Sequence, residues 1–334
     1  MNLIRQKHLQ TIKINFMKDR RTFLKQAGLV GIAGLLPTTT LLAGDLKTDT
    51  ETNDETFTQW ADGSRLVVSL SMQFEAGGQP VNSESPFPQN MQKGFIDLPG
   101  ETWYQYGYKE GIPRMLDNWD KFGVKVTSHM VGSAVLKNPD LAKEIVQRGH
   151  EAAAHGMDWA TQYSMPYETE RKFIKDGAEA IKKITGFEPV GYNANWLRRG
   201  PNTLEILQEL GFKYHIDDLS RDEPFLVKVK GNDFAVVPYT IRCNDIVLIE
   251  GKNFSADQFA RQVILEFDQL YKESEKKRRQ MSISFHDRIG GTPQMVAATA
   301  EIISYIQRHK GVSFKRKDEI AQMAYQDKNI IREL

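Results

Sequence analysis

Short apolar segments that alternate with amphipathic helical segments constrain the fold of this chain more than any other feature of its sequence. Runs of apolar and β-branched residues predict strands at residues 66–72, 124–128, 151–154, 189–192, 214–216, 281–285 and 312–314. Helical spacing of apolar residues predicts helices at residues 112–122, 139–148, 167–184, 202–210, 256–273, 294–309 and 317–325. A strand followed by a helix, repeated about six or seven times, predicts an α/β fold with a parallel sheet and helices outside it.

Two absences favour a barrel over a doubly wound nucleotide-binding sheet. No Gly-x-Gly-x-x-Gly sequence follows a predicted strand, and no Gly-x-x-x-x-Gly-Lys sequence is present. These are the glycine-rich loops that hold nucleotide phosphates. In a barrel of parallel strands, functional side chains gather where the strands end and the following loops begin.

Polar clusters stand at five predicted strand ends, at residues 73–78, 155–159, 193–200, 217–218 and 286–288. We expect them to meet at one end of the barrel. His155 and His286 each follow a buried strand and lie near a carboxylate, so we interpret both as functional. Asp217 and Asp218 are interpreted as turn residues, and Asp287 as a surface or cap residue.

The composition excludes several classes of protein. Lys and Arg number 44 against 43 Asp and Glu, so the net charge of +1 gives no sign of a nucleic-acid or anionic-membrane partner. Cys243 is the only cysteine, which rules out an intrachain disulfide and a zinc site built from several thiolates. A metal in this chain would need histidine and carboxylate ligands.

The N-terminal residues read as a targeting segment. Arg20 and Arg21 precede an uncharged apolar run at residues 27–36, which is too short to span a membrane. The pattern resembles a twin-arginine export signal, although an amphipathic helix is the alternative. We therefore predict a signal at residues 1–44, a polar linker at residues 45–62 and the barrel at residues 63–334. This predicts transport by the twin-arginine machinery to the periplasm or cell envelope.

Several motifs of the barrel resemble the polysaccharide deacetylase superfamily, also called the NodB-homology family. The sequence Gly-His-Glu-Ala-Ala-Ala-His-Gly at residues 149–156 is similar to one family motif, and Ile-Ser-Phe-His at residues 283–286 is similar to its last motif. The resemblance covers about residues 64–325. It implies a distorted seven-stranded (β/α) barrel, with His286 as the catalytic acid.

The chain departs from the typical family pattern at the positions of the metal ligands. Typical members end the first strand with two aspartates, where this chain has Gln73 and Phe74, and carry a second histidine where it has Trp159. Phe-Glu-Ala-Gly-Gly at residues 74–78 and His-Asp-Arg-Ile-Gly-Gly at residues 286–291 resemble the metal-independent allantoinases and related peptidoglycan deacetylase-like proteins. This implies no cofactor, although a divalent metal such as zinc, held by His155 and Asp158, stays open.

The reaction that the resemblance implies is hydrolysis of a carbon–nitrogen bond, in an N-acetyl amide or a cyclic ureide. Water attacks the carbonyl carbon, negative charge builds on the oxygen, and the nitrogen needs a proton to leave. Without a metal, side chains must do this work. We expect Glu75 or Asp158 to act as the base and His286 as the acid, with His155 positioning water.

Further residues are expected to bind the substrate. Arg198 or Arg199 is expected to stabilise the oxyanion or to bind a substrate carboxyl group. Tyr239 and Asn244 lie in segments that resemble a subgroup motif and are expected to contact the substrate; Asn244 could instead fix the loop. Aromatic residues of the long predicted loop at residues 73–110 either stack on sugar rings or form a small core of their own.

Three functions remain after this reading. The leading hypothesis is an exported hydrolase that removes N-acetyl groups from a glycan. The second is a metal-independent hydrolase of a small cyclic amide, as the allantoinase-like motifs indicate. The third is a glycan-binding protein without catalytic activity. The resemblance also leaves a homo-oligomer open.

Overall fold

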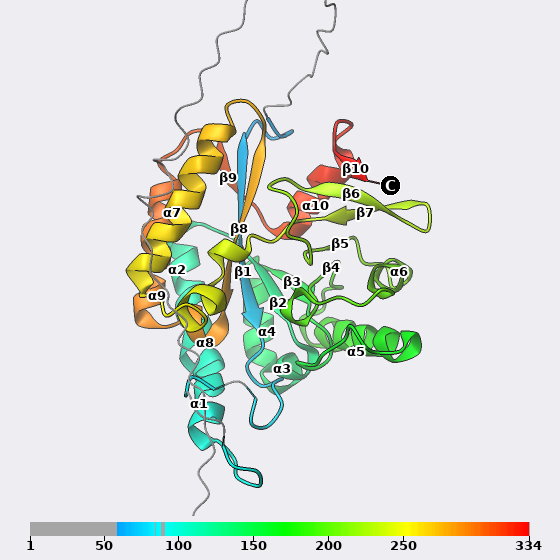
Figure 1. Cartoon of the computed structure of the whole chain (residues 1–334), viewed down its shortest axis with the longest axis vertical. Helices are drawn as coiled ribbons and strands as arrows, with labels where there is room; N and C mark the ends of the chain where they lie inside the picture. The colour runs from blue at the N-terminus through cyan, green and yellow to red at the C-terminus, as the bar shows by residue number, and fades with distance from the viewer. Residues whose placement is uncertain (1–58, 84, 88–90, 334) are drawn as a thin grey trace, which may run out of the picture. The chain divides into compact units, whose positions relative to one another are not determined.

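The computed structural model describes residues 59–83, 85–87 and 91–333 (Figure 1). The predicted export signal, and the predicted linker up to residue 58, lie outside the described residues. Within these ranges, no helix combines the length and the apolar character needed to cross a membrane.

Seven parallel strands form the centre of a ten-stranded sheet, in the order β8-β1-β2-β3-β4-β5-β7. Their bounds are β1 Leu66–Phe74, β2 Thr127–Met130, β3 Glu151–Ala154, β4 Gly191–Tyr192, β5 Tyr214–His215, β7 Asn232–Val236 and β8 Arg279–His286. The remaining strands are β6 (Phe225–Val229), antiparallel to β7, β9 (Val312–Phe314), which pairs with β1, and β10 (Arg332–Glu333), which pairs with β6.

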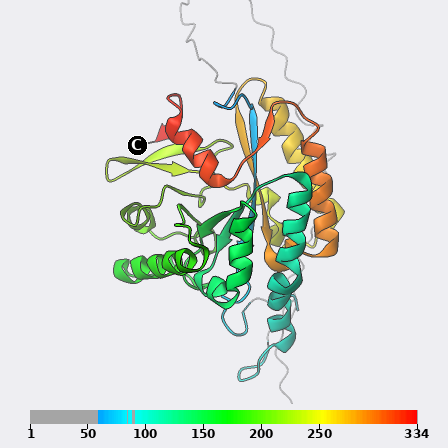
Figure 2. The same cartoon turned by 180° about the vertical axis from the view of Figure 1, so that it is seen from behind.

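Helices cover the outside of the sheet (Figures 1 and 2). On one side lie α2 (Ile112–Phe122), α7 (Ala256–Glu273) and α9 (Pro293–Ile306), and on the other lie α3 (Gly132–Lys137), α4 (Pro139–Gln147), α5 (Tyr167–Thr185) and α6 (Thr203–Glu209). The other helices are α1 (Leu98–Tyr106), α8 (Asp287–Gly290) and α10 (Lys317–Gln326). Short helical turns occur at η2 (Gly107–Gly111), η3 (Asn195–Leu197), η4 (Ile241–Cys243) and η5 (Ile246–Glu250).

The barrel closes between β8 and the irregular segment that follows β7. The backbone N–H of Ser282 donates to the Thr240 hydroxyl at 3.1 Å, and the Ser282 hydroxyl donates to the Pro238 carbonyl at 3.0 Å. A single bridge joins Asn244 to Ser284 further along. Side chains thus replace part of the strand ladder, which gives the distorted parallel barrel that the sequence predicts.

The alternation of side chains along β1 places polar residues on the inner side of the barrel, where the functional site lies. Leu66, Val68, Leu70, Met72 and Phe74 face outward and join the main hydrophobic core. The intervening positions, Ser69, Ser71 and Gln73, are buried and polar. Since successive side chains of a strand point to opposite faces, Gln73 and the residue two positions later, Glu75, lie on the inner side.

The predicted loop at residues 73–110 is wrong over its second half, which forms α1 and the π-helical turn η2. Asp97 caps α1 by accepting a hydrogen bond from the Gly100 N–H at 2.9 Å, and Pro99 stands in the first turn. The helical signal is weak in sequence because glycine and aromatic residues, which are poor helix formers, fill the segment. Tertiary packing stabilises it instead.

Candidate active site

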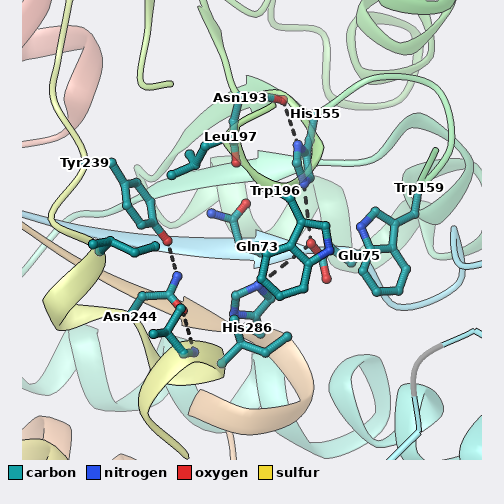
Figure 3. A pocket seen from close by; sticks show the side chains of 13 residues that line it. Gln73, Glu75, His155, Trp159, Asn193, Trp196, Leu197, Tyr239, Asn244 and His286 are labelled. Carbon is teal, nitrogen blue, oxygen red and sulfur yellow. Dashed lines mark hydrogen bonds and ion pairs between the residues drawn. The ribbon is translucent and has the colours of Figure 1, made fainter. Parts of the chain in front are cut away.

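A pocket opens where the carboxyl ends of β1, β3, β4 and β8 meet the segment after β7. We call it the catalytic pocket (Figure 3). It holds about 440 Å³ of empty space, including its open mouth. Its lining residues are Gln73, Glu75, His155, Trp159, Asn193, Trp196, Leu197, Tyr239, Ile241, Asn244, Ile246, Val247 and His286. The predicted convergence of the strand-end clusters at residues 73–78, 155–159, 193–200 and 286–288 is confirmed here.

Glu75 lies at the centre of the charged groups. Its Oε1 is 3.4 Å from His155 Nε2 and 3.9 Å from His286 Nε2, and its Oε2 accepts a hydrogen bond from Arg288 at 2.8 Å. Burial alone would raise the pKa of Glu75. The charges of His286 and Arg288, with the hydrogen bond from His155, nevertheless hold that pKa well below its usual range. Glu75 is therefore a carboxylate throughout the working pH range.

His155 is oriented by the loop after β4. Its Nδ1 lies 2.7 Å from the Asn193 carbonyl oxygen. Because a carbonyl can only accept, we assign a proton to Nδ1. Nε2 is then the nitrogen that faces Glu75 and the pocket, and it donates to the Glu75 carboxylate when it also carries a proton.

His286 is oriented by Asp245, a residue that precedes η5. His286 Nδ1 donates to Asp245 Oδ1 at 2.6 Å, and the His286 backbone N–H donates to Asp245 Oδ2 at 2.7 Å. Burial lowers the pKa of His286, but the negative charges of Asp245 and Glu75 outweigh it and raise the pKa overall. The ring therefore favours the imidazolium form, which suits a proton donor. The sequence placed Asp245 beside Asn244 without giving it this role.

Arg288 holds Glu75 from the side opposite the histidines. Its side chain is fully buried, and its guanidinium carbon lies 4.8 Å, 4.6 Å and 5.5 Å from the ring centroids of Trp103, Tyr104 and Trp159. Aromatic rings stabilise a desolvated cation in this arrangement. Two rings of the predicted aromatic loop thus form a small core around Arg288, a residue to which sequence reasoning gave no role.

Asp287 is buried, so its predicted place at the surface or as a cap is wrong. Its Oδ2 accepts hydrogen bonds from the backbone N–H groups of Glu75 and Ala76, at 3.0 Å and 2.8 Å. Burial raises the pKa of Asp287 to about 6. The chain turns into α8 directly after His286, and this turn directs Asp287 back toward β1.

The turn η2 packs its backbone directly onto Asp287. A Cβ atom at Gly107 would lie 2.7 Å from the Asp287 carboxyl carbon, and one at Gly111 would overlap the Asp287 carbonyl oxygen. Only glycine permits this approach. The segment at residues 98–111 therefore holds two groups that contact Glu75, namely Arg288 and Asp287.

Asp158 lies away from the catalytic pocket, contrary to its predicted place in the site. The chain turns at Gly156, whose φ is +75°, and Asp158 is exposed while Trp159 lines the pocket instead. The side chains of His155 and Asp158 therefore do not come together as a pair of metal ligands. In the described part of the chain, no three His, Cys, Asp or Glu side chains come together to hold a metal ion. Because the Arg288 cation occupies one oxygen of Glu75, the residues at this site do not fit a divalent metal.

Arg198 and Arg199 are exposed and line a neighbouring groove rather than the catalytic pocket. Leu197 lines both spaces, so they are adjacent. Asp217 lines the groove, is buried, and accepts hydrogen bonds from the Asn193 side chain at 2.8 Å and from the Ala194 N–H at 3.0 Å. Asp217 thus fixes the loop after β4 and is more than the turn residue predicted from sequence.

Tyr239 and Asn244, which are expected to contact the substrate, both line the catalytic pocket. The Asn244 side-chain amide donates to the Tyr239 hydroxyl. Burial raises the pKa of Tyr239, so its hydroxyl stays protonated. Gln73 stands at the same wall, and its Oε1 is buried with no hydrogen-bond partner in the described residues. This wall is neutral and hydrogen-bonding, whereas the wall around Glu75 is charged.

Known proteins share this architecture. A sequence profile of the polysaccharide deacetylase family matches residues 102–215. A probable polysaccharide deacetylase from Pseudomonas aeruginosa PAO1 superposes with a TM-score of 0.75 at 28% identity, covering 81% of this chain and 94% of that one. This chain resembles the polysaccharide deacetylase family in sequence and in fold. The family resemblance seen in the sequence, and the fold that it implied, are confirmed.

Two further proteins similar to this chain differ in the activity for which they are named. The peptidoglycan deacetylase of Helicobacter pylori is 27% identical over 244 residues, which cover 63% of this chain and 82% of that protein. Puue allantoinase is 27% identical with a TM-score of 0.75, covering 81% of this chain and 94% of its own. The similarity to known proteins therefore leaves the substrate to be argued from the site.

Proposed function

We propose that this chain is a hydrolase that removes N-acetyl groups from a glycan, after export through the twin-arginine route. The observation that carries the proposal is the placement of Glu75 between His155 and His286, each histidine with its own hydrogen-bond acceptor on the far ring nitrogen. A buried carboxylate flanked by two oriented imidazoles supplies both the proton acceptor and the proton donor that amide hydrolysis requires.

Glu75 Oε1 is the proposed base. It faces the pocket, while Oε2 is held by Arg288. A lowered pKa weakens a base, but the charge of His286 is one of its causes. When His286 gives its proton to the leaving nitrogen, that charge disappears, and Glu75 becomes the stronger base at the moment it must hold the proton of the attacking water. His155 Nε2 positions this water beside Oε1.

The Tyr239 hydroxyl is the proposed donor to the oxyanion. The expected donors, Arg198 and Arg199, line the neighbouring groove instead. The Tyr239 oxygen accepts a hydrogen bond from Asn244, and the hydroxyl belongs to a residue that lines the pocket, where its O–H can donate to a developing oxyanion. A neutral donor in a buried pocket stabilises developing charge strongly because it is already oriented before the reaction. No step of this proposal passes through a metal.

A glycan is supported by the rim of the pocket and by one relative. Trp196 is 46% exposed and lines the pocket, so its ring is available to the apolar face of a sugar. The relative in Helicobacter pylori is named for its action on peptidoglycan. The similarity to Puue allantoinase favours a second candidate, hydrolysis of a small cyclic amide by the same residues.

Acetate release tests the proposal. We would incubate purified protein with N-acetylglucosamine oligomers and with peptidoglycan, with and without EDTA, and would follow allantoin hydrolysis in parallel. We expect acetate release that EDTA does not reduce. In His286→Gln, kcat/KM should fall about a hundredfold to ten-thousandfold, because the leaving nitrogen loses its proton donor.

The alternatives give different results in the same assay. Release that EDTA abolishes would show a metal-dependent deacetylase and overturn the mechanism. Hydrolysis of allantoin without acetate release would replace the glycan with a cyclic amide. Arg261→Gln, at an exposed position of α7 far along the chain from these residues, is the matched control and should keep full activity.

A further inference from the structure

A second, more open space adjoins the catalytic pocket on the other side of the loop after β4. We call it the arginine groove. It holds about 870 Å³ of space, including open solvent. It is lined by Tyr163, Leu197, Arg198, Arg199, Gly200, Pro201 and Asp217. Its open position next to the catalytic pocket suits a sugar unit outside that pocket better than a second part of a small cyclic amide.

The loop turns sharply at the boundary between the two spaces. Trp196 and Leu197 are consecutive residues with positive φ, +52° and +58°, which is uncommon for side chains other than glycine. Trp196 lines only the catalytic pocket, Leu197 lines both spaces, and Arg198 lines only the groove. The turn therefore places the apolar side chains of Trp196 and Leu197 at the catalytic pocket. The two arginines that follow them lie in the adjacent groove.

Both arginines are exposed. Burial raises the pKa of Asp217 and lowers that of His215, and the charge of Arg199 acts to lower both pKa values. Neither arginine side chain makes a hydrogen bond or an ion pair within the described part of the chain. In contrast, Arg221 pairs with Glu333, and Arg242 pairs with Glu266. Guanidinium groups without an internal hydrogen bond or ion pair, adjacent in sequence and at the edge of a reaction pocket, are suited to bind a carboxylate or sulfate from outside.

The carboxylates near the groove do not cancel this charge. Asp217 is held by Asn193 and Ala194, and burial raises its pKa to about 7, which reduces its negative charge near neutral pH. Glu170 is fully buried behind Gly200, where it hydrogen bonds with Gln162 and Thr203. Both acids hydrogen bond within the protein and fix the loop, whereas both arginines are exposed.

We propose that the arginine groove binds an anionic substituent, a carboxylate or a sulfate, on the glycan unit next to the one whose N-acetyl group enters the catalytic pocket. The substrate class is then an acidic N-acetylated glycan. This inference rests on the proposed function for its place in the reaction, but the binding itself is independent of catalysis.

A binding experiment tests the groove without turnover. His286→Gln protein is titrated by calorimetry with a tetrasaccharide of alternating N-acetylglucosamine and glucuronic acid, and with the same compound after reduction of its carboxyl groups to alcohols. A third arm uses an N-acetylglucosamine tetramer that carries sulfate esters and no carboxyl group. We expect an anionic compound to bind about tenfold more tightly than the carboxyl-reduced one, with the difference shrinking at high salt.

The variants decide whether the groove is responsible. Combining Arg198→Gln and Arg199→Gln should abolish the preference, whereas Arg261→Gln should keep it. Tight binding of the sulfated arm alone would identify sulfate as the anion. Equal affinity for all three compounds, no binding of any of them, or a preference for an anionic compound that survives in the double variant would each overturn the inference.

Kinetics with otherwise wild-type protein separate this inference from the proposed function. On the acidic tetrasaccharide, the double Arg variant should raise KM about tenfold and leave kcat unchanged, because the groove holds ground state and transition state alike. An acid preference in binding, with no acetate release from any arm, would refute the proposed function and leave the groove standing.

Discussion

At the residue scale, each carboxylate oxygen and ring nitrogen of the catalytic pocket has its own bonding partner. Glu75 offers one oxygen to Arg288 and the other to the two histidines. Asp245 receives both the ring and the backbone N–H of His286. A single change of charge at Asp245 should therefore alter the titration of His286 without moving Glu75 directly.

Replacement of Asp245 by Asn should shift the alkaline limb of the activity profile. His286 must be protonated to donate, so activity is present below its raised pKa and is lost as pH rises through it. Asp245→Asn removes a negative charge that raises this pKa, so the loss should begin at lower pH. The measurement is kcat for acetate release between pH 5 and 10, with exposed Asp257→Asn as the control. An alkaline limb at the same pH in both proteins would assign the proton donor to another residue.

At the scale of elements, the segment formed by α1 and η2 acts as a clamp on the charged wall of the pocket. Its aromatic rings surround Arg288, and its glycines contact Asp287. The clamp is far from Glu75 in sequence, but both of its partners bind Glu75. A substitution in η2 that displaces Asp287 should therefore lower the catalytic activity, because Asp287 accepts the Glu75 backbone N–H.

Gly111→Ala should damage both stability and activity. The added methyl group would overlap the Asp287 carbonyl oxygen, and overpacking of this kind costs about 1–3 kcal/mol of unfolding free energy. Lys109→Ala, an exposed change in the same turn, should cost less than about 0.5 kcal/mol. Urea denaturation and acetate release measure the two effects. Full activity in Gly111→Ala would show that η2 only covers the barrel.

Elements with regular patterns were predictable from sequence. The predicted helices at residues 112–122 and 256–273 and the predicted strand at residues 151–154 have the observed bounds. The helices α1 and α3 were missed, because α1 depends on packing around Arg288 and α3 is one short segment between a strand and another helix.

The candidate site was only partly predictable for a related reason. Strand ends could be located, so Glu75, His155 and His286 could be placed together. Where a chain leaves a strand, however, the direction of the next side chains depends on the turn, and Asp158 and Asp287 were therefore misplaced. The contact between Asp245 and His286 joins residues that are 41 positions apart in the sequence. The periodicity of apolar residues predicts helices and strands but not such long-range contacts.

At the scale of the whole molecule, the opposite end of the barrel also contains buried charge. Lys317, the first residue of α10, is fully buried and donates to the Ser282 hydroxyl at 2.9 Å. Glu151 accepts hydrogen bonds there from Thr127 at 2.6 Å and Tyr214 at 2.7 Å. Burial lowers the pKa of Lys317 to about 7. These groups make stability depend on pH independently of the active site.

Lys317→Met should remove one part of that dependence. In the folded protein Lys317 loses its proton near pH 7, whereas in the unfolded chain it keeps it to about pH 10.4. The unfolded state therefore binds more protons between these values, and this residue makes stability rise with pH across that window. Melting temperatures from pH 6 to 10 should show a flatter profile in Lys317→Met than in wild type or in exposed Lys310→Met. Parallel profiles in all three would mean that Lys317 stays charged when folded.

The position of β1 has a consequence for how the protein can move. Ladder hydrogen bonds join it to β8 along Leu66–Gln73 and to β2 and β9 over its two halves, so it is among the last segments whose amide protons local fluctuations would expose. Glu75 follows directly from this strand, whereas Trp196 sits in an irregular turn with little regular pairing. The turn that carries Trp196 can therefore fluctuate while Glu75 stays held at the end of β1, so the entrance of the pocket can change shape without displacing the charged groups.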